Sequence, residues 1–136
     1  MGIKFTGNPR KSTLQALALM VSKEIMKAVG SEMLSLVDQG FDAQKNPYGR
    51  SWAKIRRAGR ILQKTGVMRN SFKVLHRGSA VSVFASVNYA AFHQFGTKHM
   101  VRRMMVPGKS GLPRAWRMSL DEAVNEAIAL KVANAR

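Results

Sequence analysis

Two neighbouring runs with an apolar residue at every second position constrain the fold of this 136-residue chain more than any other feature. Phe72 and Val74 occupy alternate positions in the first run, and Val81, Val83 and Ala85 do so in the second. Successive side chains of a strand point to opposite faces, so each run has the pattern of a half-buried strand. Because a turn sequence, Arg-Gly-Ser, joins the runs, we predict an antiparallel hairpin.

A long helix is predicted ahead of the hairpin. Ser12 and Gln15 have the spacing of a capping box, in which side chains satisfy free backbone N–H groups at a helix start. We expect the helix to run from Ser12 to about Asp38, with a bend at Gly30 and an end before Gly40. Its apolar stripe has helical spacing. The stripe comprises Leu14, Leu17, Val21, Ile25, Ala28, Val29, Leu36 and Val37.

A second capping box, Ser119 to Glu122, predicts a C-terminal helix that ends near Val132. Helices that flank a hairpin favour the α+β class. We therefore predict one domain over residues 1–136, with an antiparallel sheet, the long N-terminal helix packed on one face, a short aromatic helix and the C-terminal helix.

The N-terminal and central segments have turn or loop chemistry. We expect residues 1–11 to be a flexible basic arm. Pro47 and Gly49 predict a turn, and Trp52 is expected to anchor the loop that follows. A short helix is predicted from Thr65 onward.

The segment ahead of the C-terminal helix gives weaker signals. Residues 103–106 could form a third strand that ends at Pro107 and Gly108. Residues 112–118 could form a fourth short strand or a loop held by Trp116.

An aromatic stretch follows the hairpin. Tyr89, Phe92 and Phe95 are spaced i, i+3 and i+6, which places them on roughly one face of a short helix. Gly96 is expected to end that helix, because glycine adopts positive φ without a steric penalty. We interpret Tyr89 and Phe92 as core side chains, and we expect His93 to form a hydrogen bond within its own turn.

The charge distribution is the strongest compositional signal. The chain has 23 Lys and Arg against 7 Asp and Glu, a formal net charge of +16, and no acidic residue between positions 43 and 120. Sixteen basic residues lie in that span. Such a charge attracts polyanions and opposes self-association, which favours nucleic acid or an acidic protein surface as the neighbour.

Seven basic residues are candidate contacts for a polyanion or an acidic subunit. Four lie in one predicted loop that has no acid of its own, and we favour a protein partner for it because Trp52 and Ile55 could add apolar contact. The candidates are Lys54, Arg56, Arg57, Arg60, Arg102, Arg103 and Lys109.

The polar residues fit catalysis poorly. Without cysteine, and without nearby carboxylates, His93 and His99 cannot complete a metal site. The run from Pro107 to Gly111 lacks the earlier glycine of a phosphate-binding loop, since Arg103 stands there. We expect no enzyme activity, no metal and no cofactor, and no segment reaches the ~20 apolar residues of a membrane span.

Four short pieces, in series over about 55 residues, resemble the phage virion morphogenesis family, which includes the tail-completion proteins of Mu-like and P2-like phages. The pieces are Asn46-Pro47-Tyr48-Gly49-Arg50-Ser51-Trp52, Arg60-Ile61-Leu62-Gln63-Lys64-Thr65-Gly66, Arg69-Asn70-Ser71-Phe72, and Tyr89-Ala90-Ala91-Phe92-His93-Gln94-Phe95-Gly96-Thr97. The family's Pro-Ala-Arg-Pro-Phe motif corresponds to Leu112-Pro113-Arg114-Ala115-Trp116, which keeps Pro and Arg and then departs.

The resemblance implies a structural protein of the virion, at the neck or the top of the tail, that assembles in the host cytoplasm. It implies a ring of identical copies, most simply sixfold, that completes the tail and joins it to the head. The implied partners are the head–tail connector and the tail terminator or tube proteins, and a contact with packaged DNA is possible. The resemblance implies no contact with a membrane. The alternative is a stand-alone basic nucleic-acid-binding protein, which would need its basic residues on one continuous face with aromatic side chains between them.

Overall fold

The computed structural model describes residues 2–6, 11–77 and 80–134. It confirms the predicted α+β class and the antiparallel hairpin. In chain order the elements are β1 (Gly2–Thr6), α1 (Lys11–Ala43), the 3-10 turn η1 (Arg69–Ser71), β2 (Phe72–Arg77), β3 (Ala80–Ala85), α2 (Ala90–Phe95) and α3 (Arg114–Asn134).

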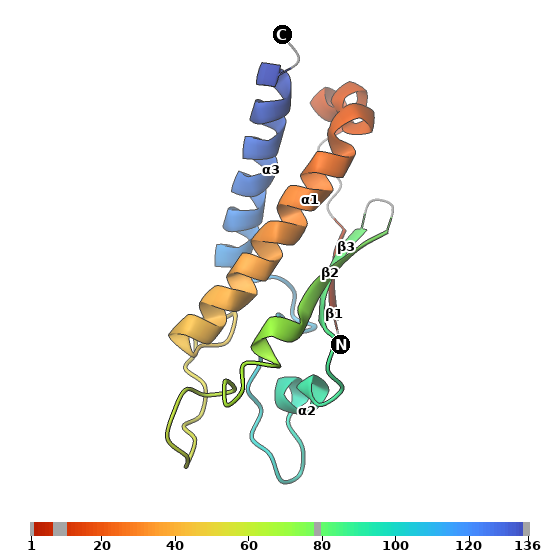
Figure 1. The fold of residues 1–136 in the computed structure, drawn as a ribbon. Helices are drawn as coiled ribbons and strands as arrows, with labels where there is room; N and C mark the ends of the chain where they lie inside the picture. The colour runs from red at the N-terminus through yellow and green to blue at the C-terminus, as the bar shows by residue number, and fades with distance from the viewer. Residues whose placement is uncertain (1, 7–10, 78–79, 135–136) are drawn as a thin grey trace.

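Helix α1 is the central layer of the molecule. It packs on β2 and β3 on one side and on α3 along the other (Figure 1). Its buried side chains Ile25, Val29 and Met33 recur at i, i+4 and i+8, as the sequence predicts for a helix on a sheet. They pack in one cluster with Val81 and Val83 of the hairpin. Helix α2 and the connecting loops lie together at one end of the molecule, away from the C-terminal end of α3 (Figure 1).

The sheet has the strand order β1-β3-β2 among the described residues, and both pairings are antiparallel. The first strand pairs from Gly2 opposite Phe84 to Thr6 opposite Ala80. The prediction of a flexible arm is therefore wrong for residues 2–6, which use the free edge of β3; residues 7–10 lie outside the described part.

Helix α1 continues beyond its predicted end and includes both glycines that were expected to disturb it. Gly30 allows close approach: a Cβ at this position would lie 2.8 Å from Val74 Cγ1. The helix ends instead at Ala43, and the next residue, Gln44, has a φ of +54°. There Lys45 N–H donates to Gly40 O and Gln44 N–H donates to Phe41 O, the Schellman pattern that satisfies terminal carbonyls.

Helix α3 begins five residues earlier than the capping box at Ser119 predicts. It starts at Arg114 after Pro113, which suits a helix start because proline needs no hydrogen-bond partner for its nitrogen. Trp116 and Leu120, spaced i and i+4, are both buried on the inner face of this helix. The predictions of a strand or loop at 112–118 and of a strand at 103–106 are therefore wrong.

Candidate interface at the basic end

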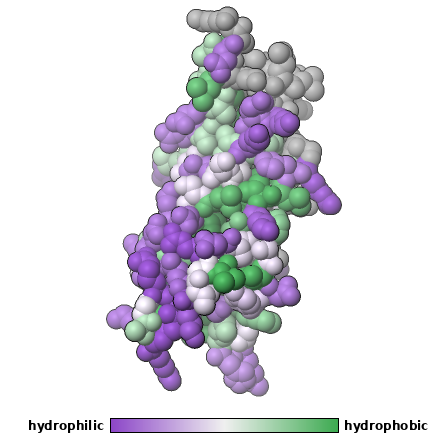
Figure 2. All heavy atoms as spheres, in the orientation of Figure 1, coloured by the Kyte–Doolittle hydropathy of each residue, from purple (hydrophilic) through white to green (hydrophobic). Residues whose placement is uncertain are grey.

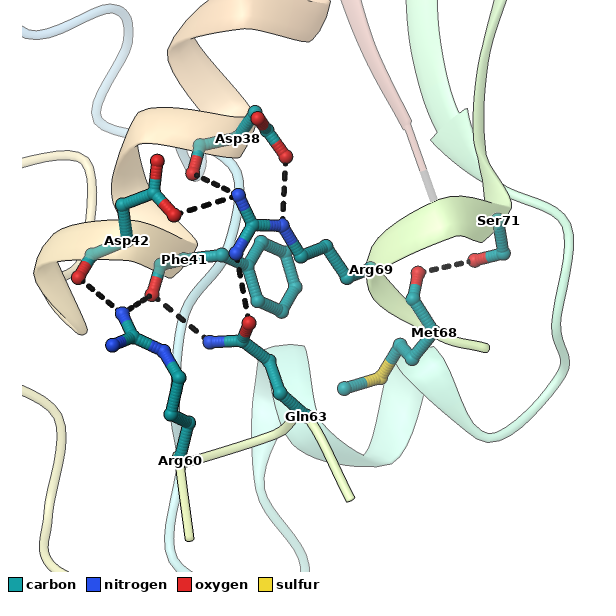
Figure 3. Close-up of polar contacts among 8 residues, drawn as sticks. All are labelled: Asp38, Phe41, Asp42, Arg60, Gln63, Met68, Arg69 and Ser71. Atoms are coloured by element: carbon teal, nitrogen blue, oxygen red, sulfur yellow. Dashed lines mark hydrogen bonds and ion pairs between the residues drawn. The ribbon is translucent and has the colours of Figure 1, made fainter. Parts of the chain in front are cut away.

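Arg69 joins η1 to the C-terminal end of α1 and to Gln63 of the loop between them (Figure 3). Arg69 Nε donates to Asp38 Oδ1 and its Nη2 donates to Asp42 Oδ1, both at 2.7 Å. Its Nη1 donates to Gln63 Oε1 at 2.8 Å, and the guanidinium lies 5.8 Å from the Phe41 ring centroid. Hydrogen bonds from Arg69 lower the pKa of Asp38, and those to both aspartates raise the pKa of Arg69. Arg69 thus takes up the carboxylates nearest in sequence to the basic loop.

Arg60 and Gln63 satisfy the carbonyl end of α1 (Figure 3). Arg60 Nη2 donates to the backbone oxygens of Phe41 and Asp42, and Gln63 Nε2 donates to Phe41 O at 3.1 Å. A cation is favoured at the C-terminus of a helix because the last carbonyls carry partial negative charge. Arg60, predicted as a contact residue, therefore has a role within the fold.

Trp52 and Tyr48 join the same loop to distant segments. The buried Trp52 donates from Nε1 to Met104 O at 2.8 Å and packs edge-on against Phe41. Tyr48 Oη donates to Gly111 O at 2.6 Å and accepts from Gly108 N–H at 3.2 Å. The turn predicted at residues 46–49 is present, with Gly49 at a φ of +88°.

Gln94 is a structural residue that the sequence interpretation missed. It is only 1% exposed. Its Oε1 accepts from the N–H groups of Met105 and Val106, and its Nε2 donates to Val106 O. One side-chain amide therefore pairs with the backbone of Met105 and Val106 as a neighbouring strand would, so these two residues need no strand partner. The signal available in the sequence was the position of Gln94, four residues after Ala90 and therefore on the same face of the helix.

The aromatic side chains of α2 point away from the core. Tyr89, Phe92 and Phe95 are 42%, 55% and 62% exposed. The predicted shared face exists, but the core interpretation of Tyr89 and Phe92 is wrong because Ala90 and Gln94 occupy the buried face. Gly96 ends the helix at a φ of +73°, and a Cβ there would lie 3.1 Å from the backbone nitrogen of Arg102.

A pocket of about 250 Å³ opens beside this aromatic face. Cationic residues of the loop and of the segment after α2 surround it, and no carboxylate is among its described lining residues. They are Ile55, Arg57, Leu62, Lys64, Thr65, Gly66, Met68, Tyr89, His93 and Arg103.

His93 is partly buried at the wall of this pocket. Its Nδ1 is buried without a hydrogen-bond partner among the described residues, contrary to the prediction of a bond within its turn. Its ring lies edge-on to Tyr89 at 6.4 Å. Burial, with a smaller contribution from the Arg103 charge, lowers the pKa of His93 and favours the neutral imidazole.

The predicted contact cations fall into two groups. Arg102 donates to Gln94 O, Arg103 donates to the backbone of Ala53 and Lys54, and Arg57 donates to Ala58 O and Arg60 O. The side chains of Lys54, Arg56 and Lys109 are exposed and have no polar partner within the described part of the chain. We call the loop 44–68, α2 and residues 97–104 the basic end; Lys109 lies outside it, on the loop that Tyr48 holds. Figure 2 shows hydrophilic side chains gathered over the loop after α1.

Two other features, a metal site and a membrane-spanning helix, were sought throughout the described part of the chain. Within residues 2–6, 11–77 and 80–134, no three histidine or acidic side chains come together as metal ligands would. In the same part of the chain, no helix combines the length and hydropathy that crossing a bilayer requires.

The fold and its basic end define a small α+β protein with an exposed cationic and aromatic surface. The sequence matches the phage virion morphogenesis family over residues 11–129, so the chain belongs to that family. The resemblance seen in the short motifs is thereby confirmed, and the protein has a structural or morphogenetic role in a bacteriophage virion. Searches of curated proteins and of solved structures find no match.

Proposed function

We propose that this protein completes the tail and joins it to the head, as a ring of identical copies at the neck or the top of the tail. A sixfold ring is the simplest arrangement. The role is structural, without catalysis. The chain assembles in the host cytoplasm and remains in the virion, where its neighbours are the head–tail connector and the tail terminator or tube proteins.

The observation that carries this proposal is the exposed aromatic face beside unpaired cations. Three aromatic rings of about 200 Å² each, roughly half exposed, present about 300 Å² of apolar surface. The largest apolar patch on a typical monomer measures about 300–600 Å² and is often functional, so a surface of this size is a candidate interface. Trp52, from which apolar contact was expected, is buried, so Tyr89, Phe92 and Phe95 supply it instead. Membership of the morphogenesis family supports a partner within the virion.

The proposal is tested by imaging particles made without this protein. We expect full heads and separate tails, and we expect the chain to restore joined particles when it is supplied in trans. A reconstruction of the intact virion should show it as a ring between head and tail. Joined, infectious particles in its absence would refute the role.

The exposed aromatics also favour the alternative, a nucleic-acid-binding protein, more than the sequence did. Aromatic faces interleaved with cations can hold single-stranded nucleic acid by stacking and charge. Duplex binding that neutralises about four phosphates should weaken with a log–log salt slope near −3.6. The test compares the parent with a double variant, Lys54→Gln and Arg56→Gln, which keeps the hydrogen bonds of Arg60 to the end of α1. Lost DNA retention with unchanged head–tail joining would favour the alternative.

A further inference from the structure

A second pocket, which we call the α1–α3 groove, lies between α1 and α3. Its charged lining residues are acidic, whereas those of the pocket at the basic end are cationic. The groove measures about 620 Å³ and runs along the seam where the two helices pack. Small side chains keep it open. The lining comprises Glu24, Ala28, Ser31, Glu32 and Ser35 from α1, and Ala123, Glu126, Ala127, Leu130 and Asn134 from α3. Both sets recur at close to i, i+4, i+7 and i+11, so each is one face of its helix.

Outside the two Arg69 ion pairs, the carboxylates of the chain lie on the helices that form the groove. Asp38 and Asp42 are bound by Arg69. The other five, Glu24, Glu32, Asp121, Glu122 and Glu126, all lie on α1 and α3. Three of them line the groove, where no described lining residue is Lys or Arg. The pocket at the basic end is lined by three cations and no described carboxylate.

We propose that the α1–α3 groove receives the basic end of a second copy of this chain. The aromatic face of α2 lies against the small side chains of the groove, and Lys64 with its neighbouring cations faces the groove's carboxylates. This inference deepens the proposed ring, on which it rests, by naming its subunit contact.

A second copy fits both surfaces better than nucleic acid does. Phosphates would be attracted to the basic end and repelled by Glu32 and Glu126, so DNA could account for one surface and not for the other. Because the two surfaces are different, the contact between copies is heterologous. A heterologous contact repeats head to tail and closes into a ring when the rotation permits, whereas a self-complementary contact stops at a dimer.

The local charge match also answers the objection that copies carrying +16 should repel one another. At physiological ionic strength, charges more than about 8 Å apart are largely screened, while a contacting pair is screened much less. The repulsion is therefore reduced more than the contact between the carboxylates and the cations. We expect association to be strongest at intermediate salt.

Charge exchange tests the contact in the purified protein. Lys64→Glu and Glu126→Lys should each weaken association about tenfold, which corresponds to about 1.4 kcal/mol. The double variant, which restores opposite charges, should recover most of the loss. Matched controls are Lys73→Glu on β2 and Glu122→Lys on α3, which make the same charge changes outside the two linings. The readout is sedimentation at high protein concentration.

Zero-length carbodiimide cross-linking of mixed light and heavy isotope-labelled protein identifies the contact. We expect links from Lys64 to Glu32 or Glu126 between light and heavy copies. Phe92→Ala should reduce the linked fraction while leaving the unfolding curve in place, which separates an interface role from misfolding. Absence of these links, or a double variant no better than its parents, would overturn the inference. Correct links in a protein absent from the neck would instead refute the proposed function.

Discussion

Replacing Gln94 by alanine should destabilise the protein strongly although the residue is polar. The change removes three buried hydrogen bonds, two from backbone N–H groups and one to a carbonyl. At about 0.5–1.5 kcal/mol for each bond, with the stranded groups of Met105 and Val106 left buried, the loss is about 3 kcal/mol. For a chain of this length, that lowers Tm by roughly 10 °C.

The measurement is urea and thermal unfolding followed by circular dichroism. Gln94→Glu is an informative partner variant, because an ionised carboxylate can accept from both N–H groups but cannot donate to Val106 O. Burial raises the pKa of such a carboxyl, so its stability should recover as pH falls through the raised pKa. A Gln94→Ala protein that unfolds within about 1 kcal/mol of the parent would refute the assigned role.

Three further variants test separate contacts. Gly30→Ala should cost about 1–3 kcal/mol through its clash with Val74, and adding Val74→Ala should recover part of the loss in a double-mutant cycle of unfolding free energies. Arg69 lowers the pKa of Asp38, so this pair stabilises the fold above the ordinary carboxyl pKa, and the contribution is lost as pH falls through the lowered one. Arg69→Gln should therefore flatten the dependence of stability on pH between roughly pH 5 and pH 2, where paired carboxylates become protonated. His93 has a lowered pKa, so stability should fall as pH drops below its ordinary value of 6.5, and His93→Gln should remove that slope; an unchanged slope would point to another group.

The parts of the fold that follow local periodicity could be predicted from the sequence. The hairpin and the inner face of α1 both came from the spacing of apolar residues. The strand at Gly2–Thr6 could not, because its partner in β3 lies more than seventy residues away in the chain. Its short apolar alternation competes with a glycine and a proline that suggest a loop.

The orientation of α2 shows why the candidate site was harder to predict. Helical spacing placed Tyr89, Phe92 and Phe95 on one face, but hydrophobicity alone assigned that face to the core. The backbone of residues 105 and 106 instead needed an amide partner, and Gln94 provides it. A contact formed with a segment eleven residues further on decided which face is buried, and no pattern within α2 records it.

The place of β1 in the sheet sets an order for folding. It is synthesised before its partner β3, which ends at Ala85. At about 5–20 residues per second, some 80 residues take roughly 4–16 s to follow it from the ribosome. During that interval β1 has no native strand to pair with, and once β3 has formed its outer edge stays open until β1 docks. An N-terminal extension that delays the docking of β1 should therefore lower the yield of soluble protein during synthesis more than it lowers the stability of the finished fold.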